Sequence, residues 1–432
     1  MLKQKIKIYF GVIDLSKGQK RFMMVFDTAD TYEFLIERNL LAFVTSKDID
    51  GYFDHVWTVN AVASLFSPSS SGLRYGRPVV RELAKGHTHI EGKIGRFEKL
   101  AWFAALNFLF AQVELMWLLL KLVKKNRIAI IRAEDPYFNG IFGLIIAVIK
   151  KLPLVIGVWG NSEAIRKETK KPLSPRLKWI WLEKLVERFI LRRADIVLAG
   201  NVDNMDFVLR QGVHQERSAI IRIGNAIDGS HFLAPDKRVS GVADLAELGV
   251  RGQKVLMCIS RLEPLKLPDH LVRALACLKG RNLNIKVLFV GDGGAKEALV
   301  NLSEELDVSD QIVFCGNRDQ SWLSRVIPCA AVVVSPLTGR ALAEAALGGA
   351  PIVAYDIDWH VEVVETGVTG ELVPHLNYSL MADAIEKILK DEKYGHIIGA
   401  NARERMLKMM DPQAIDELLI GIYEKLLIPK TA

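Results

Sequence analysis

The clearest indication of the fold is the stretch Ala331-Val332-Val333-Val334-Ser335-Pro336-Leu337-Thr338-Gly339-Arg340-Ala341-Leu342-Ala343-Glu344-Ala345. Its apolar, β-branched beginning is typical of a parallel strand covered on both faces. Thr338 and Gly339 suit the start of a helix over residues 341–347, and Gly348-Gly349 suits its end. Residues 351–355 predict a second strand. The stretch therefore predicts one β-α-β unit.

The loop between this strand and helix predicts an anion site. In a β-α-β unit this loop directs helix amide groups and the positive end of the helix dipole toward a ligand such as a diphosphate. Glu344 follows in the first turns of the helix, where its carboxylate can accept hydrogen bonds from ribose hydroxyls. A glutamate that only complements the helix dipole is an alternative that this residue alone leaves open.

Two cations follow a second predicted strand, Lys254–Ile259. Arg261 and Lys266 stand on a proline-containing loop before a helix expected at residues 269–278. A guanidinium can bind diphosphate through two hydrogen bonds, and an ammonium acts as a point charge. The pair could therefore neutralise a departing nucleoside diphosphate without a metal, although ordinary surface cations are the alternative.

Further motifs follow in a fixed order: Ile259-Ser260-Arg261-Leu262 with Lys266, Val290-Gly291-Asp292-Gly293, Val313-Phe314-Cys315-Gly316-Asn317, Glu344-Ala345, and residues 349–354, 362–364 and 367–374. In this order and spacing, residues 194–389 resemble the retaining glycosyltransferases of family 4, group 1. The resemblance implies an α/β fold of the GT-B type: two Rossmann-like lobes face across a cleft, and a C-terminal helix crosses back to the first lobe.

The resemblance also implies roles for single residues. Arg261 and Lys266 would be catalytic cations that hold the diphosphate, and Glu344 would hold the ribose. The other donor-binding residues that it implies are Gly291, Gly293, Asn317, Arg318, Thr338, Gly339, Arg340, Ala341 and Leu342.

One departure from the family concerns its Glu-x7-Glu pair, because Pro336 stands where the first glutamate would be. We therefore expect a shortened loop between Pro336 and Gly339 that contacts the sugar differently. In the retaining chemistry that the resemblance implies, the leaving phosphate takes the acceptor's proton, and neither a metal nor a cofactor takes part. His87 and His89 lack the ligand spacing of a zinc site.

The first half of the chain is less informative. We expect strands at residues 5–12, 54–59 and 128–131 and at Leu154–Val158, and a helix over residues 31–46. Four residues after the last two strands are predicted to face the acceptor, loosely as in the family: Glu134, Asp135, Trp159 and Asn161. Glu134, Asp135 and His55 include candidates for a catalytic base, with solvated carboxylates as the alternative.

Length and composition predict two folded lobes, because 432 residues, half of them apolar and 25% charged, exceed what one core usually holds. We expect an acceptor-binding lobe over residues 1–235, a nucleotide-sugar-binding lobe over residues 236–410, and a last helix over residues 411–432 that packs on the first lobe.

The four cysteines lack metal-ligand spacing, and no signal peptide is recognised. These features predict reduced thiols in a cytoplasmic protein.

Two segments raise the question of a membrane. Residues 100–123 are almost long enough to span a bilayer, but their interruption by Asn107, Gln112 and Glu114 favours a buried or interfacial helix. Residues 166–193 contain ten Lys or Arg against three Glu, interleaved with large apolar residues. They suit an anionic lipid surface, and a solvated amphipathic helix is the equal alternative. Nucleic acid is not expected, because no known binding module accompanies the charge.

Together these features predict a retaining, metal-independent glycosyltransferase that moves a sugar from a nucleotide-sugar donor to a glycan or lipid-linked acceptor in polysaccharide or glycoconjugate synthesis. Two alternatives stay open. One is a nucleotide-sugar epimerase of the same fold, and the other is a non-catalytic, membrane-attached pseudo-transferase.

Overall fold

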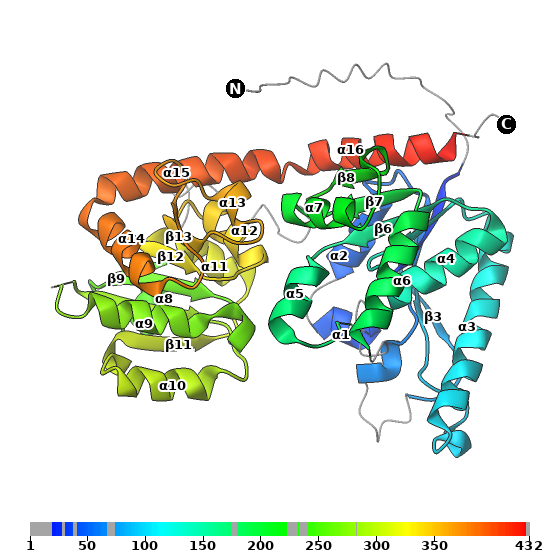
Figure 1. Cartoon of the computed structure of the whole chain (residues 1–432), viewed down its shortest axis with the longest axis horizontal. Coiled ribbons are helices and arrows are strands. Elements are labelled where there is room, and N and C mark those ends of the chain that lie inside the picture. Colours follow the sequence, from blue (N-terminus) through cyan, green and yellow to red (C-terminus); the bar gives the residue numbers. More distant parts are fainter. Residues whose placement is uncertain are drawn as a thin grey trace. The chain divides into compact units, whose positions relative to one another are not determined.

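The chain divides into two compact units (Figure 1). Unit 1 comprises Met1–Gly157, Lys171–Val197 and Ile420–Ala432, and unit 2 comprises Val158–Lys170 and Leu198–Leu419. The computed structural model describes residues 20–27, 31–37, 41–66, 74–173, 179–222, 232, 241–281 and 283–428.

The first sheet has eight strands in the order β3-β4-β2-β1-β5-β6-β7-β8. β1 (Phe22–Phe26) pairs in parallel with both of its neighbours, and β3 pairs antiparallel with β4 at one edge. Central strands such as β1 are apolar and buried on both faces, as a parallel sheet covered by helices requires. The other strands are β2 (His55–Asn60), β3 (Val79–Ala84), β4 (His87–Glu91), β5 (Ile130–Ala133), β6 (Leu154–Val158), β7 (Ile196–Ala199) and β8 (Ser218–Ile220).

The helices in this part of the chain include three long ones, and the middle one, α4, packs against α3, α6 and strands β1 and β5. The α-helices among the described residues here are α1 (Tyr32–Glu37), α2 (Leu41–Thr45), α3 (Ala104–Asn126), α4 (Phe138–Lys150), α5 (Ser162–Thr169), α6 (Ile180–Arg193) and α7 (Val202–Arg210).

The second sheet lies entirely in unit 2 and has the order β11-β10-β9-β12-β13-β14 with all pairs parallel. In chain order this is the 3-2-1-4-5-6 arrangement of a dinucleotide-binding fold, whose strand order reverses between β9 and β12. The strands are β9 (Lys254–Ile259), β10 (Ile285–Val290), β11 (Ile312–Gly316), β12 (Val332–Ser335), β13 (Ile352–Tyr355) and β14 (Glu371–Val373).

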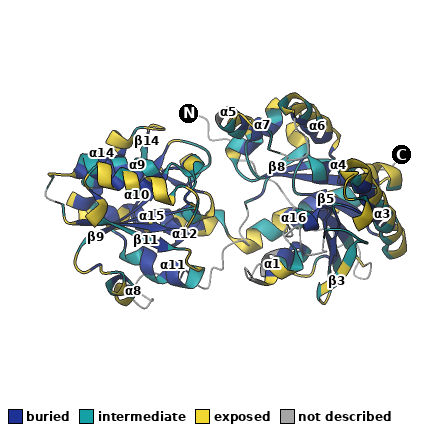
Figure 2. Cartoon of the chain, turned by 90° about the horizontal axis from the view of Figure 1, so that it is seen from below, coloured by how far each residue is buried: buried dark blue, intermediate teal, exposed yellow. Residues whose placement is uncertain are grey.

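Helices cover both faces of the second sheet, and each face has its own core. Met257 of β9 belongs to one core, and its neighbours Leu256 and Cys258 belong to the other. Figure 2 shows the buried strands in dark blue beneath partly exposed helices. The helices are α8 (Val242–Glu247), α9 (Pro268–Leu278), α10 (Lys296–Glu305), α11 (Gln320–Val326), α12 (Arg340–Leu347), α13 (His360–Val363), α14 (Tyr378–Lys390), α15 (Glu392–Met409) and α16 (Pro412–Leu427).

The last part of α16 belongs to unit 1, as predicted for a helix that returns to the first lobe. Tyr423 packs edge-on against Phe53, with ring centroids 5.2 Å apart. Its hydroxyl accepts a hydrogen bond of 3.1 Å from Arg132. One aromatic contact and one hydrogen bond therefore hold the end of α16 in this unit.

The predicted α/β fold is confirmed, and β6, β9, β12 and β13 lie where the sequence predicts strands. Helices α1 and α2 lie within the helix expected over residues 31–46, and residues 38–40 between them lie outside the described residues. The strand expected at residues 5–12 lies outside the described residues, as do residues 236–240 of the second predicted lobe. Strand β1 was not predicted from the sequence.

Candidate nucleotide-sugar site

A cavity of about 360 Å³ opens at the carboxyl ends of β9 and β12, where the strand order of unit 2 reverses. Ligands of open α/β sheets bind at such points. The cavity is lined by Ile259, Ser260, Arg261, Lys266, Val290, Gly291, Asn317, Arg318, Leu323, Thr338, Gly339, Arg340, Ala341 and Glu344. It thus brings together both predicted cations, Glu344 and most of the predicted donor-binding residues.

Two of the predicted donor-binding residues do not line the cavity. Leu342 is fully buried in the core beneath α12. Gly293 lets the backbone pack closely against the loop after β9. A Cβ at this position would stand 2.5 Å from the carbonyl oxygen of Leu262. The amide of Leu262 in turn donates to the carbonyl of Asp292 at 3.0 Å.

Gly291 allows the two strand-end loops to approach each other. It has a φ of +135°, and a Cβ here would lie 1.9 Å from the carbonyl oxygen of Ser260. No other residue fits this position. The close approach places Arg261, which is exposed, at the mouth of the cavity. Lys266 follows at the end of a short 3-10 turn that leads into α9.

Glu344 is 2% exposed and lies on the inner side of α12. The amide nitrogen of Gln320 donates to its Oε1 at 3.2 Å, and Nε of Arg340 lies 3.1 Å from the same oxygen. Burial raises the pKa of Glu344, while the Arg340 charge and the Gln320 hydrogen bond oppose that rise. Among the described residues both contacts use Oε1, which leaves Oε2 as an acceptor for a ligand hydroxyl.

A buried histidine that the sequence analysis missed, His360, holds the loop after β12. The Thr338 amide donates to Nε2 of His360 at 3.3 Å, and Nδ1 lies 3.1 Å from the carbonyl oxygen of Tyr355. Nε2 also lies 3.1 Å from the carbonyl oxygen of Thr338, and burial lowers the pKa of His360. Trp359 also donates to the Thr338 carbonyl, at 3.4 Å. A single histidine on a short helix gives no sequence signal for this contact.

The loop after β11, with Asn317 and Arg318, also lines the cavity. Nε of Arg318 donates to the carbonyl oxygen of Cys315 at 3.1 Å, and its guanidinium lies 5.1 Å from the centre of the Trp322 ring. Asp319 caps α11 by accepting from the Trp322 amide at 2.7 Å. None of the four cysteines, all of which the structure describes, forms a disulfide, and burial raises the pKa of Cys315 to about 11.

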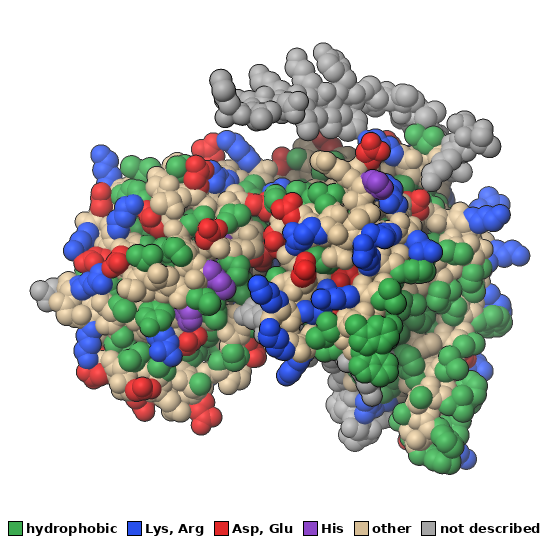
Figure 3. Space-filling model, viewed as in Figure 1, with side chains coloured by type: hydrophobic (Ala, Val, Ile, Leu, Met, Phe, Trp, Pro, Cys, Tyr) green, Lys and Arg blue, Asp and Glu red, His purple; other side chains and the backbone are tan. Residues whose placement is uncertain are grey.

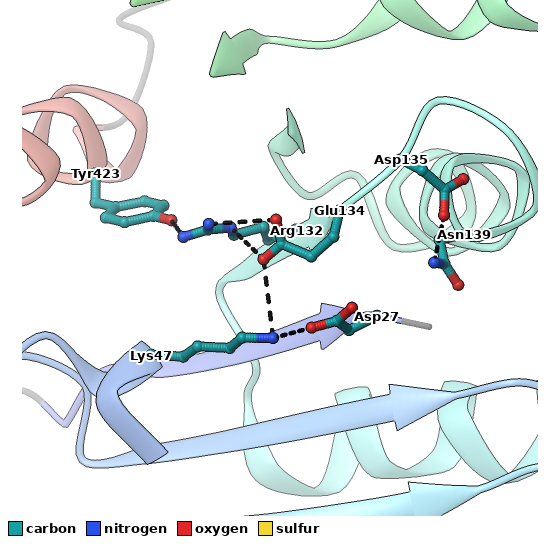
Figure 4. A network of polar contacts seen from close by, with 7 residues as sticks. All are labelled: Asp27, Lys47, Arg132, Glu134, Asp135, Asn139 and Tyr423. Atoms are coloured by element: carbon teal, nitrogen blue, oxygen red, sulfur yellow. Dashed lines mark hydrogen bonds and ion pairs between the residues drawn. The ribbon is translucent and has the colours of Figure 1, made fainter. Parts of the chain in front are cut away.

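Among the predicted acceptor residues, Glu134 belongs to a network of charged side chains in unit 1 (Figure 4). Its Oε1 lies 2.9 Å from Nε of Arg132 and 4.0 Å from Nζ of Lys47, which also pairs with Asp27. Burial acts to lower the pKa of Arg132, but Glu134 and Tyr423 outweigh it and hold the pKa above its ordinary value.

Asp135 stands beside this network and points toward α4 (Figure 4). It accepts hydrogen bonds from the Tyr137 amide at 2.8 Å and from the Asn139 side chain at 2.5 Å. Burial raises its pKa to about 6 despite these bonds. His55, the third candidate base, lies at the amino end of β2, so the structure does not bring it to the carboxyl edge that carries Glu134 and Asp135.

The other two predicted acceptor residues, Trp159 and Asn161, belong to unit 2. Asn161 caps α5 by accepting from the Ala164 amide at 3.1 Å, and its side-chain nitrogen donates to Asp203 at 2.9 Å. Trp159 lies against Gly200 at the end of β7. Within the described part of the chain, no group of three or more His, Cys, Asp or Glu is arranged to hold a metal.

Comparison with known proteins agrees with this geometry. Residues 245–405 match the family described as glycosyl transferases group 1. The chain is 24% identical to the alpha-D-kanosaminyltransferase of Streptomyces kanamyceticus over 64% of its own length and 71% of that protein. It is 29% identical to the D-inositol 3-phosphate glycosyltransferase of Nocardia farcinica, over 48% of this chain and 47% of the relative.

Solved structures show the same fold. HepE of Anabaena in complex with UDP has a TM-score of 0.69 and 18% identity, with 94% of this chain and 100% of HepE covered. Sucrose-phosphate synthase of Thermosynechococcus elongatus has a TM-score of 0.70 at 18% identity, with 94% and 99% covered.

These findings confirm the predicted resemblance to the group 1 glycosyl transferases and the predicted GT-B type of fold. The chain is a glycosyltransferase.

Proposed function

We propose that this glycosyltransferase is retaining and metal-independent and that it passes its sugar to a glycan or lipid-linked acceptor in polysaccharide or glycoconjugate synthesis. One observation carries the proposal: Arg261, Lys266 and Glu344 line a single cavity at the point where the strand order of unit 2 reverses. We assign donor binding to this cavity.

Arg261 and Lys266 would hold the diphosphate, one through a planar guanidinium and the other through a point charge. As the bond between the sugar carbon and the phosphate oxygen breaks, negative charge grows on that oxygen, and the two cations stabilise it. The same oxygen takes the proton of the acceptor hydroxyl while the new glycosidic bond forms on the same face. These reaction steps require neither a protein base nor a metal.

The loop after β12 would replace the contacts of the glutamate that Pro336 displaces. The hydroxyl oxygen of Thr338 is buried and has no hydrogen-bond partner within the described part of the chain. A buried polar group of this kind is costly unless a ligand satisfies it. Thr338 is therefore our candidate contact to the donor sugar or its phosphate.

Glu134 and Asp135 of unit 1 and Trp159 and Asn161 of unit 2 stay our candidates for contacts to the acceptor. Glu134 would act only by holding its neighbours, because it is already paired with Arg132. We also propose a cytoplasmic protein that attaches peripherally to the membrane.

Thermal stabilisation by UDP-, GDP- and ADP-sugars tests the donor site. A sugar nucleotide at about a hundred times its dissociation constant should stabilise the protein by about 2.7 kcal/mol. Lys266→Ala should abolish the shift. Lys390→Ala should keep it, because Lys390 forms only an exposed pair with Glu386 on α14. No shift with any of these nucleotides would refute the proposal.

Product analysis then separates the activities. Incubation with the donor alone should leave the sugar configuration unchanged, whereas an epimerase would alter it. With an acceptor, the anomeric configuration of the product tests retention, and activity in EDTA tests metal independence.

A further inference from the structure

Large apolar side chains are exposed together on three neighbouring helices of unit 1. Helix α4 contacts both α3 and α6, so the outer sides of the three helices form one surface. Figure 3 shows hydrophobic side chains gathered over these helices. Among the most exposed are Trp102 and Trp117 of the α3 region, at 75% and 60%, Val148 of α4 at 67%, and Trp179 and Trp181 of the α6 region, at 59% and 64%.

Helix α3 is apolar on two opposite sides. One stripe, with Ala111, Leu115 and Leu119, is buried against unit 1. The other stripe repeats every three or four residues through Leu109, Val113 and Trp117 and faces outward. By length and composition α3 could cross a membrane. Its buried stripe instead favours a helix that lies in the plane of the interface with one side packed on protein.

The charges around this apolar surface are cationic. Lys121, Lys124 and Lys125 are exposed at the end of α3, and Lys151 follows α4. Nζ of Lys121 lies 3.2 Å from the centre of the Trp117 ring. Aromatic rings flanked by Lys and Arg are typical of the headgroup region of a bilayer.

The acidic side chains of the same helices are withdrawn from the surface. Glu183 and Glu187 of α6 are 0% and 1% exposed, and Glu187 accepts a hydrogen bond from the Tyr137 hydroxyl at 2.8 Å. Glu114 of α3 pairs with Arg96 and Arg77. The exposed surface therefore combines apolar area with positive charge, which complements anionic lipid and would repel a second copy of itself.

We propose that the surface of α3, α4 and α6 binds flat to an anionic lipid bilayer, with its tryptophans at headgroup depth and its cations on lipid phosphates. This sharpens the expectation for residues 166–193. Among the described residues of this segment, α6 and Trp179 before it contribute, whereas α5 belongs to unit 2 and its Arg166 is buried beside Ser162. The proposal rests on the peripheral attachment proposed above and places it in the fold, but it does not rest on the donor site, whose cavity residues belong to unit 2.

Sedimentation of the full chain with vesicles tests the surface. Vesicles with about one-third phosphatidylglycerol should bind the protein, pure phosphatidylcholine should bind it at least tenfold more weakly, and added salt should release it, because the cations act on the anionic headgroups. Trp117→Ser with Trp181→Ser should lower binding to the anionic vesicles at least tenfold. Val242→Ser with Ile397→Ser, which changes exposed apolar residues of unit 2, should leave it unchanged.

Failure of the anionic vesicles to bind, or equal binding by the tryptophan variant, would overturn the proposal. So would a dimer that the tryptophan substitutions dissociate, because a second copy would then occupy this surface. The nucleotide-induced thermal shift, measured without vesicles, reports on the donor site and should be the same in the wild type and in both double variants. A failed donor site and a failed lipid surface are thus distinguishable.

Discussion

The two sheets use charged residues at their strand ends in different ways. In unit 2, Arg261 and Lys266 line an open cavity at the end of β9. In unit 1, Arg132 and Glu134 at the end of β5 pair with each other and are almost fully buried. Similar residues at equivalent ends of parallel strands thus form a binding cavity in one unit and a structural network in the other.

The difference comes from what surrounds the strand ends. Gly291 brings two loops together beneath the cavity, so that the cations project beyond the backbone. In unit 1, Tyr423 of α16 closes over Arg132 and supplies a hydrogen-bond partner. A strand-end charge therefore indicates a ligand site only where no other element of the chain satisfies it.

Of the four substitutions that we consider, Arg132→Met should have the largest effect, because it breaks the network of charged side chains in unit 1. Removing one partner leaves Glu134 buried with a reduced set of positive charges, and the expected loss is about 3–5 kcal/mol in the free energy of unfolding. Denaturant unfolding measures it. The double variant Arg132→Met, Glu134→Gln should recover part of the loss, and the nucleotide-induced shift should persist. A loss below about 1 kcal/mol would show that the network is not structural.

Arg261→Ala should lower the activity and leave the stability of the fold almost unchanged, the opposite of what we expect for Arg132→Met. This exposed side chain contributes little to folding, so the free energy of unfolding should stay within about 0.5 kcal/mol of wild type. Loss of a contact to the developing phosphate charge should lower kcat/KM about a hundred- to a thousandfold, or about 2.7–4 kcal/mol. Steady-state kinetics measure it, and Arg261→Lys should retain part of the activity. Full activity in Arg261→Ala would show that this cation of unit 2 does not act on the ligand, and the contrast with the structural cations of unit 1 would then fail.

The sequence predicted unit 2 far better than unit 1, for a physical reason. Around β9 and β12, strand, loop and helix signals follow each other within few residues, so local pattern fixes both the fold and the cavity residues. The partners in unit 1 are distant in sequence: Arg132 meets Tyr423 across 291 positions. No local pattern predicts such a contact. His360 in unit 2 was missed likewise, because its partner Thr338 precedes it by 22 residues.

Asp135→Asn tests whether the buried carboxyl beside the network costs stability. Burial raises the pKa of Asp135 to about 6, above the ordinary value near 3.9, so the folded state holds this proton more tightly than the unfolded state does. The stability that it contributes is present below about pH 4 and is lost as the pH rises through 6. Relative to Asp135→Asn, wild type should therefore lose roughly 2–3 kcal/mol over this range. Parallel unfolding curves across these pH values would contradict the raised pKa.

Glu344→Gln makes the smallest change and tests the same chemistry in unit 2. A neutral amide should accept ribose hydroxyls more weakly than a carboxylate and lower nucleotide affinity about tenfold, or about 1.4 kcal/mol. Because burial raises the pKa of Glu344, wild-type affinity should fall as the pH drops through this raised value, whereas that of Glu344→Gln should not. Calorimetric titration with UDP from pH 8 to 5 measures both. An affinity that is equally independent of pH in both proteins would mean that this buried carboxylate serves α12 and not the ligand.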